Sequence, residues 1–290
     1  MRFQHIIEQV YFQPWYITPS GHFAIHAILE SRLGIMPPAG ASAAASAGAP
    51  APQAFDFKEL FAQRRPLSID AEGIATVHIL GPLGRGLSKL EKSCGATDFA
   101  DIQAEIREAV AKGAKGILLD INSPGGTVSG TPETARLVAT KALPTVVFVD
   151  DLMASAAYYI GAGADAIVAE ESAVVGSIGV YIPWMDYSER IRALGYKPAP
   201  IVNKGGDLKA LGFGGSLTDV QRGYLQEMVD ADFGAFRDHV RAFRDVPDSA
   251  MRGQILKGQP ALDAALVDQL GDRAAAVAKL RSLIGARPAA

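Results

Sequence analysis

The sequence has a single cysteine, Cys94, among its 290 residues. A disulfide within the chain and a cysteine-rich metal site are therefore excluded, which fits a reducing compartment. The chain also lacks any run of about 18 to 20 apolar residues that would cross a bilayer. Residues 1–15 lack the basic start, apolar middle and small-residue cleavage site of a signal peptide. We therefore expect a cytoplasmic protein with no membrane partner.

An excess of charge of either sign is also missing. There are 28 basic and 31 acidic residues, a net charge of −3, and no basic stripe of the kind that binds a phosphate backbone. Nucleic acid is therefore not an expected partner. His5, His22 and His26 lie near the N-terminus, but their spacing matches no common ligand pattern, so we expect no metal site.

The composition divides the chain into three parts. Residues 37–54 (PPAGASAAASAGAPAPQA) carry no charge and almost no large side chain, which is typical of a flexible linker. Residues 1–36 form an N-terminal arm with aromatic and histidine residues that is too small to fold alone. The third part, residues 55–290, is long enough to bury a sizeable core.

After the linker, short apolar runs alternate with segments of helical period. This alternation is typical of an α/β domain with a largely parallel, buried sheet. The strand candidates are residues 75–80, 116–121, 145–150, 166–170, 177–182 and 198–202.

Three helices are predicted from apolar periodicity and capping residues. The first has Phe99, Ile102, Ile106 and Val110 on one face, and the second begins with Thr131 as the expected N-cap. The third covers residues 217–244, where apolar side chains recur at intervals of three or four. We interpret that recurrence as packing.

The first place that could carry chemistry is INSPGG, residues 121–126, directly after the strand candidate 116–121. The proline and two glycines force a sharp turn and leave the Gly125 and Gly126 amides free of side-chain cover. Uncovered amides suit an oxyanion. A plain strand-to-helix turn would have the same sequence, so this motif alone does not decide between the two.

The second place is Ser155, one strand downstream, at the predicted first turn of a helix (ASAAYYIGAG). There the Ala156 amide can point at the same developing negative charge as the Gly125 amide. The surroundings differ from the G-x-S-x-G elbow, because Met153 and Ala157 replace its glycines. A buried serine at a helix start is the alternative.

A nucleophilic serine needs a base, and the choice of base is narrow. The only histidine after Ser155 is His239, inside the long helix and with no acidic partner implied, so a Ser-His-Asp triad is poorly supported. A lysine can act as base only if burial lowers its pKa enough to leave the amine neutral. The glycine-rich segment 203–215 offers Lys204, which looks like a solvated charge, and Lys209, which has apolar neighbours. A surface lysine remains the alternative for both.

The segments INSPGG, MASAAYYIGAGADAIVAEESAVVGSIGVY, NKGGDLKALG and KGQPALDAALVDQLGD follow one another in this order. Together they resemble the signal peptide peptidase A (protease IV) family of Ser-Lys serine peptidases over about residues 73–275. The resemblance implies a Clp protease/crotonase-like fold, in which strand-strand-helix units repeat as a superhelix around a largely parallel sheet. It also makes residues 55–290 a serine peptidase domain.

The matching motifs imply a role for each candidate residue. Ser155 becomes the nucleophile, Lys209 the general base, and the Gly125 and Ala156 amides the oxyanion hole, while Ser177 of GSIGV is placed to orient the lysine. The lysine segment has Gly205 and Gly206 where the family often has Ser-Gly. The chemistry needs no metal or cofactor, and the serine and lysine of one site can come from neighbouring subunits, which implies a homo-oligomer.

The arm (PWYITPSGHFAIHAIL) and the linker resemble the phage members of the family, of the minor capsid protein C or prohead protease type. We therefore expect a capsid-maturation protease that acts on peptide, capsid or scaffold proteins in the host cytoplasm or within a procapsid. A soluble bacterial peptidase that clears signal peptides or fragments is the first alternative.

Three other readings stay open. A Clp-type protease would need a triad histidine a couple of dozen residues after the serine, where this chain has SIGVYIP. A crotonase-like acyl-CoA enzyme would use the paired amides with a carboxylate and would need neither Ser155 nor Lys209. A non-catalytic capsid component is the reading in which the chain is not an enzyme.

Overall fold

The structure is a computed structural model that describes residues 14–18, 21, 65–140, 142–184, 186, 188–213 and 215–286. Most of the predicted arm and the whole predicted linker, residues 37–54, lie outside the described residues. The chain forms two compact units. The larger combines Tyr16–Gly179 with Phe236–Ala290, and the smaller combines Met1–Trp15 with Val180–Ala235. The predicted division into arm, linker and peptidase domain stays a prediction.

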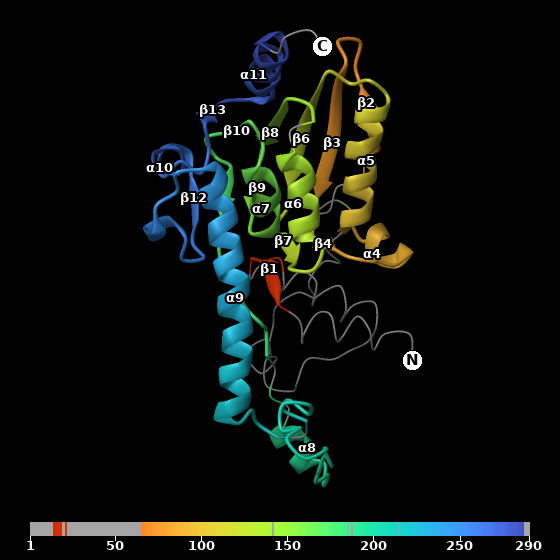
Figure 1. Ribbon diagram of the computed structural model, residues 1–290, viewed down its shortest axis with the longest axis vertical. Helices are drawn as coiled ribbons and strands as arrows, with labels where there is room; N and C mark the ends of the chain where they lie inside the picture. The colour runs from red at the N-terminus through yellow and green to blue at the C-terminus, as the bar shows by residue number, and fades with distance from the viewer. Residues whose placement is uncertain are drawn as a thin grey trace, which may run out of the picture. The chain divides into compact units, whose positions relative to one another are not determined.

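A six-stranded sheet forms the centre of the larger unit (Figure 1), in the order β13-β10-β8-β6-β3-β2. Its strands are β2 (Ser68–Ile69), β3 (Ile74–Leu80), β6 (Gly116–Asn122), β8 (Thr145–Val149), β10 (Ala166–Ala169) and β13 (Gln269–Leu270). All neighbours pair in parallel except β2, which runs antiparallel to β3 at the edge. The predicted α/β class with a largely parallel sheet is confirmed.

The same unit repeats a strand, a second short strand and a helix along the chain. The first members are the long strands β3, β6 and β8, and the second members are β4 (Leu83–Gly84), β7 (Gly125–Thr127) and β9 (Leu152–Ala154). The helices are α5 (Phe99–Ala111), α6 (Thr131–Ala139) and α7 (Ala156–Ala162). This is the strand-strand-helix repeat that the resemblance implied.

The short strands build two smaller sheets next to the helices. One has the order β1-β7-β4-β5 and the other β12-β11-β9. Their further strands are β1 (Trp15–Ile17), β5 (Thr97–Asp98), β11 (Val174–Gly176) and β12 (Ile255–Lys257). Each strand-strand-helix repeat thus places its second, short strand in the same region of the larger unit, together with the turn that follows that strand.

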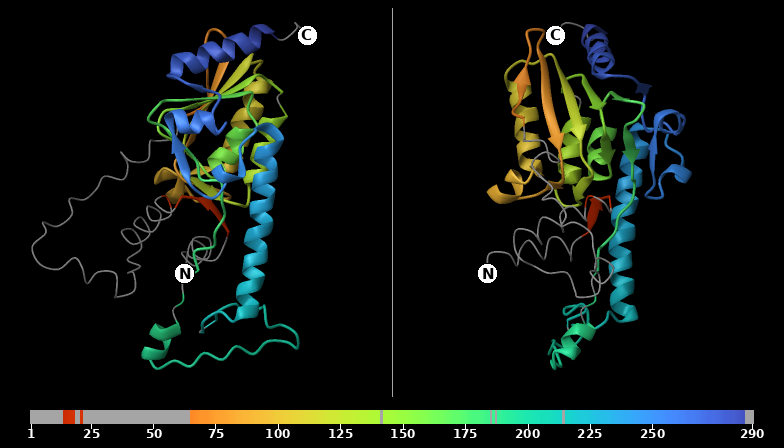
Figure 2. Two further views of the ribbon diagram at one scale, coloured as in Figure 1. Left: turned by 90° about the vertical axis from the view of Figure 1, so that its left-hand side faces the viewer. Right: turned by 180° about the vertical axis from the view of Figure 1, so that it is seen from behind.

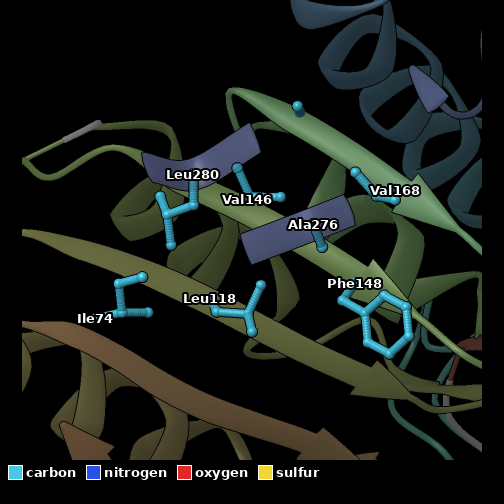
Figure 3. Close-up of a cluster of buried hydrophobic side chains, with 8 residues drawn as sticks. Ile74, Leu118, Val146, Phe148, Val168, Ala276 and Leu280 are labelled. Carbon is cyan, nitrogen blue, oxygen red and sulfur yellow. The ribbon is translucent and has the colours of Figure 1, made fainter. Parts of the chain in front are cut away.

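Helices cover both faces of the central sheet (Figure 2). Within β6, the side chains of Ile117 and Leu119 point to α5 and α6, while that of Leu118 points to α11 (Arg273–Ala286). This alternation buries both faces, which explains why the strand sequences are continuous apolar runs. Figure 3 shows the cluster under α11, which contains Ile74, Leu118, Val146, Phe148, Ala166, Val168, Ala276 and Leu280.

The remaining elements are short, apart from one long helix. They are α4 (Lys89–Ser93), α8 (Ser188–Ala193), the 3-10 helix η1 (Asp248–Ala250) and α10 (Gly258–Asp263). The long helix α9 (Asp219–Phe243) belongs to the smaller unit up to Ala235 and to the larger unit from Phe236.

The structure corrects two strand predictions and one cap. Residues 177–182 form no strand beyond a bridge at Tyr181, because β11 ends at Gly176 and the next residue has a positive φ. Residues 198–202 are irregular, and residues 199–202 are exposed. The N-cap of α6 is Gly130, at φ 102°, so Thr131 begins the helix instead of capping it.

The predicted apolar faces of two helices are only partly buried. Val110 on α5 is 41% exposed, whereas Phe99, Ile102 and Ile106 are buried as predicted. On α9 only Phe236 and Val240 are buried within the chain, so the interpretation of its whole stripe as packing was wrong. The apolar side chains on the rest of the helix are at least partly exposed, among them Val220, Tyr224, Met228 and Phe243.

Among the described residues of the smaller unit, Trp15 is the only buried apolar side chain. The large exposed apolar side chains of this unit are Leu194, Tyr196, Ile201, Val202, Phe213, Val220, Tyr224 and Met228. Local hydrogen bonds order the chain instead: Thr218 and Gln221 form a reciprocal capping box at the start of α9, and Trp15 pairs with Tyr181. A surface that faces only water seldom exposes so many large apolar side chains.

Candidate active site

Ser155 stands at the junction between β9 and α7, where it is the N-cap of the helix. Its backbone has φ 57° and ψ −116°, a strained conformation for a residue with a side chain. The residue is 1% exposed, and its Oγ has no hydrogen-bond partner among the described residues. A strained, buried and unpartnered hydroxyl at a strand-to-helix turn is the geometry of a nucleophile elbow, without that motif's glycines.

Neighbouring strands hold this junction in place. The Ser155 N–H donates to the Gly176 carbonyl at 2.8 Å, and the Ser155 carbonyl accepts from the Tyr159 N–H at 2.8 Å inside the helix. The helix is buried along its whole length, and its first residues, Ala156 and Ala157, are small. Because the first N–H groups of a helix have no partner within it, the Ala156 amide belongs to the set that a ligand can use.

Gly125 follows the proline of the INSPGG turn and begins β7. It has φ 103°, and a Cβ placed on it would lie 2.2 Å from the Tyr16 carbonyl oxygen and 2.9 Å from the Ser155 Cβ. No residue larger than glycine fits there without displacing one of them. The structure therefore brings the predicted turn and the predicted nucleophile into direct contact.

The Gly125 amide, which the sequence suggested as an oxyanion donor, has a partner within the chain. It donates to the Ser123 Oγ at 3.2 Å, and that hydroxyl donates in turn to the Gly81 carbonyl at 2.7 Å. The assignment of Gly125 to the oxyanion hole stays a prediction. A substrate oxyanion would have to replace the Ser123 hydroxyl as acceptor.

Ser123 is the site residue that the sequence analysis missed. It is 0% exposed, its N–H donates to the Leu152 carbonyl, and its carbonyl accepts from the Ala154 N–H. Through its backbone it fixes β9, and through its hydroxyl it fixes the Gly125 turn. The only signal for Ser123 in the sequence is its position directly before Pro124 of the turn.

Ser177 lies beside Ser155. The strands β9 and β11 pair in parallel with Ala154 opposite Gly176, so the next residue of each strand is a serine, and both have positive φ. Ser177 is buried, and its N–H donates to the Gln254 carbonyl at 2.8 Å. Its proximity to the candidate nucleophile fits the predicted role, and the role itself stays a prediction.

Lys209 belongs to the smaller unit, whereas the four other predicted site residues belong to the larger unit. It ends a turn in which its N–H donates to the Gly206 carbonyl at 2.9 Å, and its side chain is exposed within the chain. The two glycines before it suit this loop: Gly205 has φ 76°, and a Cβ on Gly206 would lie 2.6 Å from the Asn203 Oδ1. A lysine that acts as a general base is expected to be buried by apolar groups, and the described residues of the smaller unit do not bury Lys209.

His239, the only histidine after Ser155, has another task. Its Nε2 lies 2.9 Å from the Tyr159 carbonyl oxygen, and its ring stacks on the Tyr159 ring at 4.1 Å. Burial lowers the pKa of His239, which favours the neutral ring. Together with the buried Arg244, which donates to the Ala162 carbonyl, it serves the last carbonyls of α7. This contact supports the helix that begins at Ser155. Because the His239 Nε2 is bonded to the Tyr159 carbonyl, it is not available as the base of a triad.

None of the helices in the described part of the chain is long and apolar enough to cross a membrane. Within the same residues, no three His, Cys, Asp or Glu side chains are grouped so that they could hold a metal ion.

Comparison with known proteins decides the family. The model of peptidase family S49 matches residues 138–287, just over half of the chain, and this range includes Ser155, Ser177 and Lys209. The chain belongs to peptidase family S49. The resemblance to the signal peptide peptidase A family is thereby confirmed, and S49 peptidases are serine proteases.

This S49 chain is similar to proteins of archaea, bacteria and phages. A protein of Methanocaldococcus jannaschii is 37% identical over 176 residues, which is 58% of this chain and 56% of that protein. Capsid assembly protease C of Escherichia phage lambda is 28% identical over 222 residues, 74% of this chain and 50% of that protein. The chain thus spans about half the length of the curated relatives it matches.

Solved structures are similar at a lower level. A mutant of ClpP1 from Listeria monocytogenes is 12% identical, with a TM-score of 0.45, over 70% of this chain and 94% of that chain.

Proposed function

We propose that this S49 chain is a serine endopeptidase in which Ser155 is the nucleophile and Lys209 the general base. Lys209 takes the proton of the Ser155 hydroxyl while the oxygen attacks a peptide carbonyl, and the proton then passes to the leaving amine. A water molecule, activated by the same lysine, hydrolyses the acyl-enzyme. No metal or cofactor takes part in these steps.

The observation that carries the proposal is the state of Ser155. A strained backbone costs about 1–3 kcal/mol, and a buried hydroxyl without a hydrogen bond adds a further cost. An ordinary helix-start serine would relax both by accepting a hydrogen bond from the N–H groups of its helix. Ser155 makes no such side-chain capping bond. A hydroxyl kept free at this cost is available for attack.

The oxyanion of the tetrahedral intermediate is assigned to the Gly125 and Ala156 amides. Gly125 is in contact with the Ser155 side chain, and Ala156 begins the helix that follows it. When the negatively charged oxygen forms, it is a stronger acceptor than the neutral Ser123 hydroxyl. We infer that the Gly125 amide gives up its hydrogen bond to the Ser123 hydroxyl and donates to the oxyanion instead. We also infer that Ser177 orients the amine of Lys209.

The apolar cover of Lys209 is assigned to a second copy of the chain. The unit that carries Lys209 exposes many large apolar side chains, including Ile201, which is 99% exposed. Burial of these side chains against a neighbouring copy would stabilise the assembly and surround the lysine with apolar groups. The protein is then a homo-oligomer in which each site joins the serine of one copy with the lysine of the next.

The proposal is tested by hydrolysis of casein and of a quenched fluorescent peptide. Ser155→Ala and Lys209→Arg should each lower kcat by about 10³-fold or more. Lys204→Arg, five residues away in the same loop, should leave it unchanged, as should addition of EDTA. Activity of Ser155→Ala or Lys209→Arg near that of the unaltered chain would contradict the assignment.

We further propose that the physiological substrates are capsid or scaffold proteins of a phage. The similarity over 74% of the chain to a capsid assembly protease supports this choice. Incubation of the protein with phage capsid and scaffold proteins should yield cleaved products that the Ser155→Ala variant does not form. Uncleaved capsid proteins together with rapid hydrolysis of free signal peptides would favour the alternative, a peptide-clearing bacterial enzyme.

A further inference from the structure

A short strand of the N-terminal region lies against the candidate oxyanion turn. Strand β1 is the neighbour of β7, the strand that begins at Gly125 (Figure 1). Beyond it, the Thr18 N–H donates to the Pro124 carbonyl at 3.0 Å. A Cβ on Gly21 would lie 2.6 Å from the Pro124 Cβ. The segment is thus held to the turn by backbone hydrogen bonds and by close packing.

The carbonyl group of Tyr16 lies near the side chain of Ser155. Its oxygen and the Ser155 Cβ both border the small space that a side chain on Gly125 would occupy. The Tyr16 ring packs on the other side against Tyr159 and Phe236, with ring centroids 5.7 and 4.9 Å apart. An extended backbone, with a carbonyl beside the nucleophile and an anchored side chain, is how a peptide substrate would be presented to Ser155.

The sheet leaves a substrate no other edge of β7. β7 lies between β4 and β1, with Leu83 of β4 opposite Gly126. Extended peptides commonly bind by adding a strand to a sheet edge next to the site, so that main-chain hydrogen bonds hold them. Strand β4 belongs to the strand-strand-helix repeat of the fold, and β1 does not, so β1 is the neighbour of β7 that a peptide can replace without breaking the repeat. Because Trp15, Tyr16 and Ile17 are buried, the replacing peptide would have to bury apolar side chains in their place.

We propose that β1 with Thr18 is a pseudosubstrate strand that occupies the peptide-binding edge of β7 and must be displaced by substrate. The inference rests on the proposed function, because it takes Ser155 as the nucleophile and Gly125 as part of the oxyanion hole. It explains why Ser155 is only 1% exposed, although a nucleophile has to meet its substrate. It also names the ligand class: an extended peptide that replaces β1 by strand exchange.

The test uses the full-length chain and the rate at which a fluorophosphonate labels its serine. Thr18→Pro removes the N–H that donates to Pro124. Thr18→Ala is the matched control, since both variants lose the Thr18 hydroxyl, which accepts from the Gly21 N–H, and only the proline variant also loses the backbone donor. We expect Thr18→Pro to be labelled about fivefold faster than Thr18→Ala, because only the proline variant loses the backbone hydrogen bond to Pro124.

A second arm guards against a folding defect in the proline variant. A synthetic peptide with the sequence of residues 12–20 should slow the labelling of Thr18→Pro in a saturable manner, and a scrambled peptide should not. Equal labelling rates for all three proteins, together with no effect of the peptide, would overturn the pseudosubstrate strand and leave the proposed function standing. No labelling of Ser155 in any of the three proteins would contradict the proposed function, and with it this inference.

Discussion

The backbone N–H of Ser155 donates to the carbonyl oxygen of Gly176 at 2.8 Å. This bond continues the parallel ladder of β9 and β11 by one residue, up to the point where each strand is followed by a serine of positive φ. The ladder therefore fixes the strained conformation of Ser155 from outside the helix that it begins. Two expectations follow for the residues that maintain this geometry.

The strain at Ser155 should be measurable as stability. Glycine adopts φ 57°, ψ −116° without cost, whereas alanine keeps the strain of the serine. After allowing for the greater freedom of glycine in the unfolded chain, Ser155→Gly should be more stable than Ser155→Ala by about 1 kcal/mol. Urea unfolding of the two inactive variants gives the comparison. An alanine variant as stable as the glycine variant would show that the backbone is relaxed.

Loss of the Ser123 hydroxyl should affect both stability and turnover. Ser123→Ala leaves the Gly81 carbonyl and the Gly125 amide without their shared partner, which should cost about 1–3 kcal/mol in the free energy of unfolding. Because the Gly125 turn then loses its position beside Ser155, kcat should fall about tenfold with little change in KM.

The exposed Ser129 of the same segment provides the matched control, and Ser129→Ala should alter neither quantity by much. An unchanged kcat in Ser123→Ala would mean that the turn is held by other contacts.

A charge cluster around the buried Asp120 of the central sheet should make stability depend on pH. Asp120 on β6 lies opposite His78 on β3, with Oδ2 3.0 Å from the His78 Nδ1 and 2.7 Å from a guanidinium nitrogen of Arg273. Burial by itself raises the pKa of Asp120, but the hydrogen bonds and charges of His78 and Arg273 outweigh it and lower the pKa below its usual value. The ionised carboxylate is therefore favoured in the folded state.

The pH dependence of stability follows from that direction. A carboxyl group whose pKa is lower when folded contributes stability above its unfolded pKa, about 4, and this contribution is lost as the pH falls through the folded value. Asp120→Asn should therefore be clearly less stable than the unaltered chain at pH 7, and the gap should shrink on acidification below pH 4. Glu72→Gln, which breaks the exposed pair of Glu72 with Arg281, is the control and should change stability little at either pH. A gap for Asp120→Asn that does not depend on pH would contradict the assignment.

The sequence predicted the central strands and the Gly125–Ser155 neighbourhood because these depend on local pattern and on parallel topology. The continuous apolar runs of β6 and β8 are typical of buried parallel strands, the glycines of the turn favour a sharp bend, and the repeat brings the ends of these segments together. Ser123 escaped notice because its role arises from hydrogen bonds to Gly81 and Leu152, which only the folded sheet brings near.

The strand at residues 198–202 and the packing of α9 were predicted wrongly for a different physical reason. Residues 198–202 are apolar, and Val220 and Tyr224 recur at the interval of a core-facing stripe, yet residues 199–202, Val220 and Tyr224 are all exposed within one chain. An apolar pattern predicts that side chains are buried, but it does not distinguish burial within one chain from burial against a second chain.

Mixing two inactive variants should show whether neighbouring copies share a site. If each site joins the serine of one copy with the lysine of the next, Ser155→Ala and Lys209→Ala chains in equal amounts should restore about a quarter of the activity after random subunit exchange. If both residues came from one chain, no mixture would be active. Continued inactivity of mixtures that mass spectrometry shows to have exchanged would exclude the shared site and leave the roles of Ser155 and Lys209 intact.

The most direct test of the central claim, that Ser155 is a nucleophile activated by Lys209, is to locate a fluorophosphonate adduct by peptide mass spectrometry. The account predicts one adduct per chain, on Ser155, in the unaltered protein. It predicts no adduct in Ser155→Ala and labelling slowed by about 10²-fold or more in Lys209→Ala. An adduct on another residue, or labelling of Ser155 at the same rate without the lysine, would contradict it.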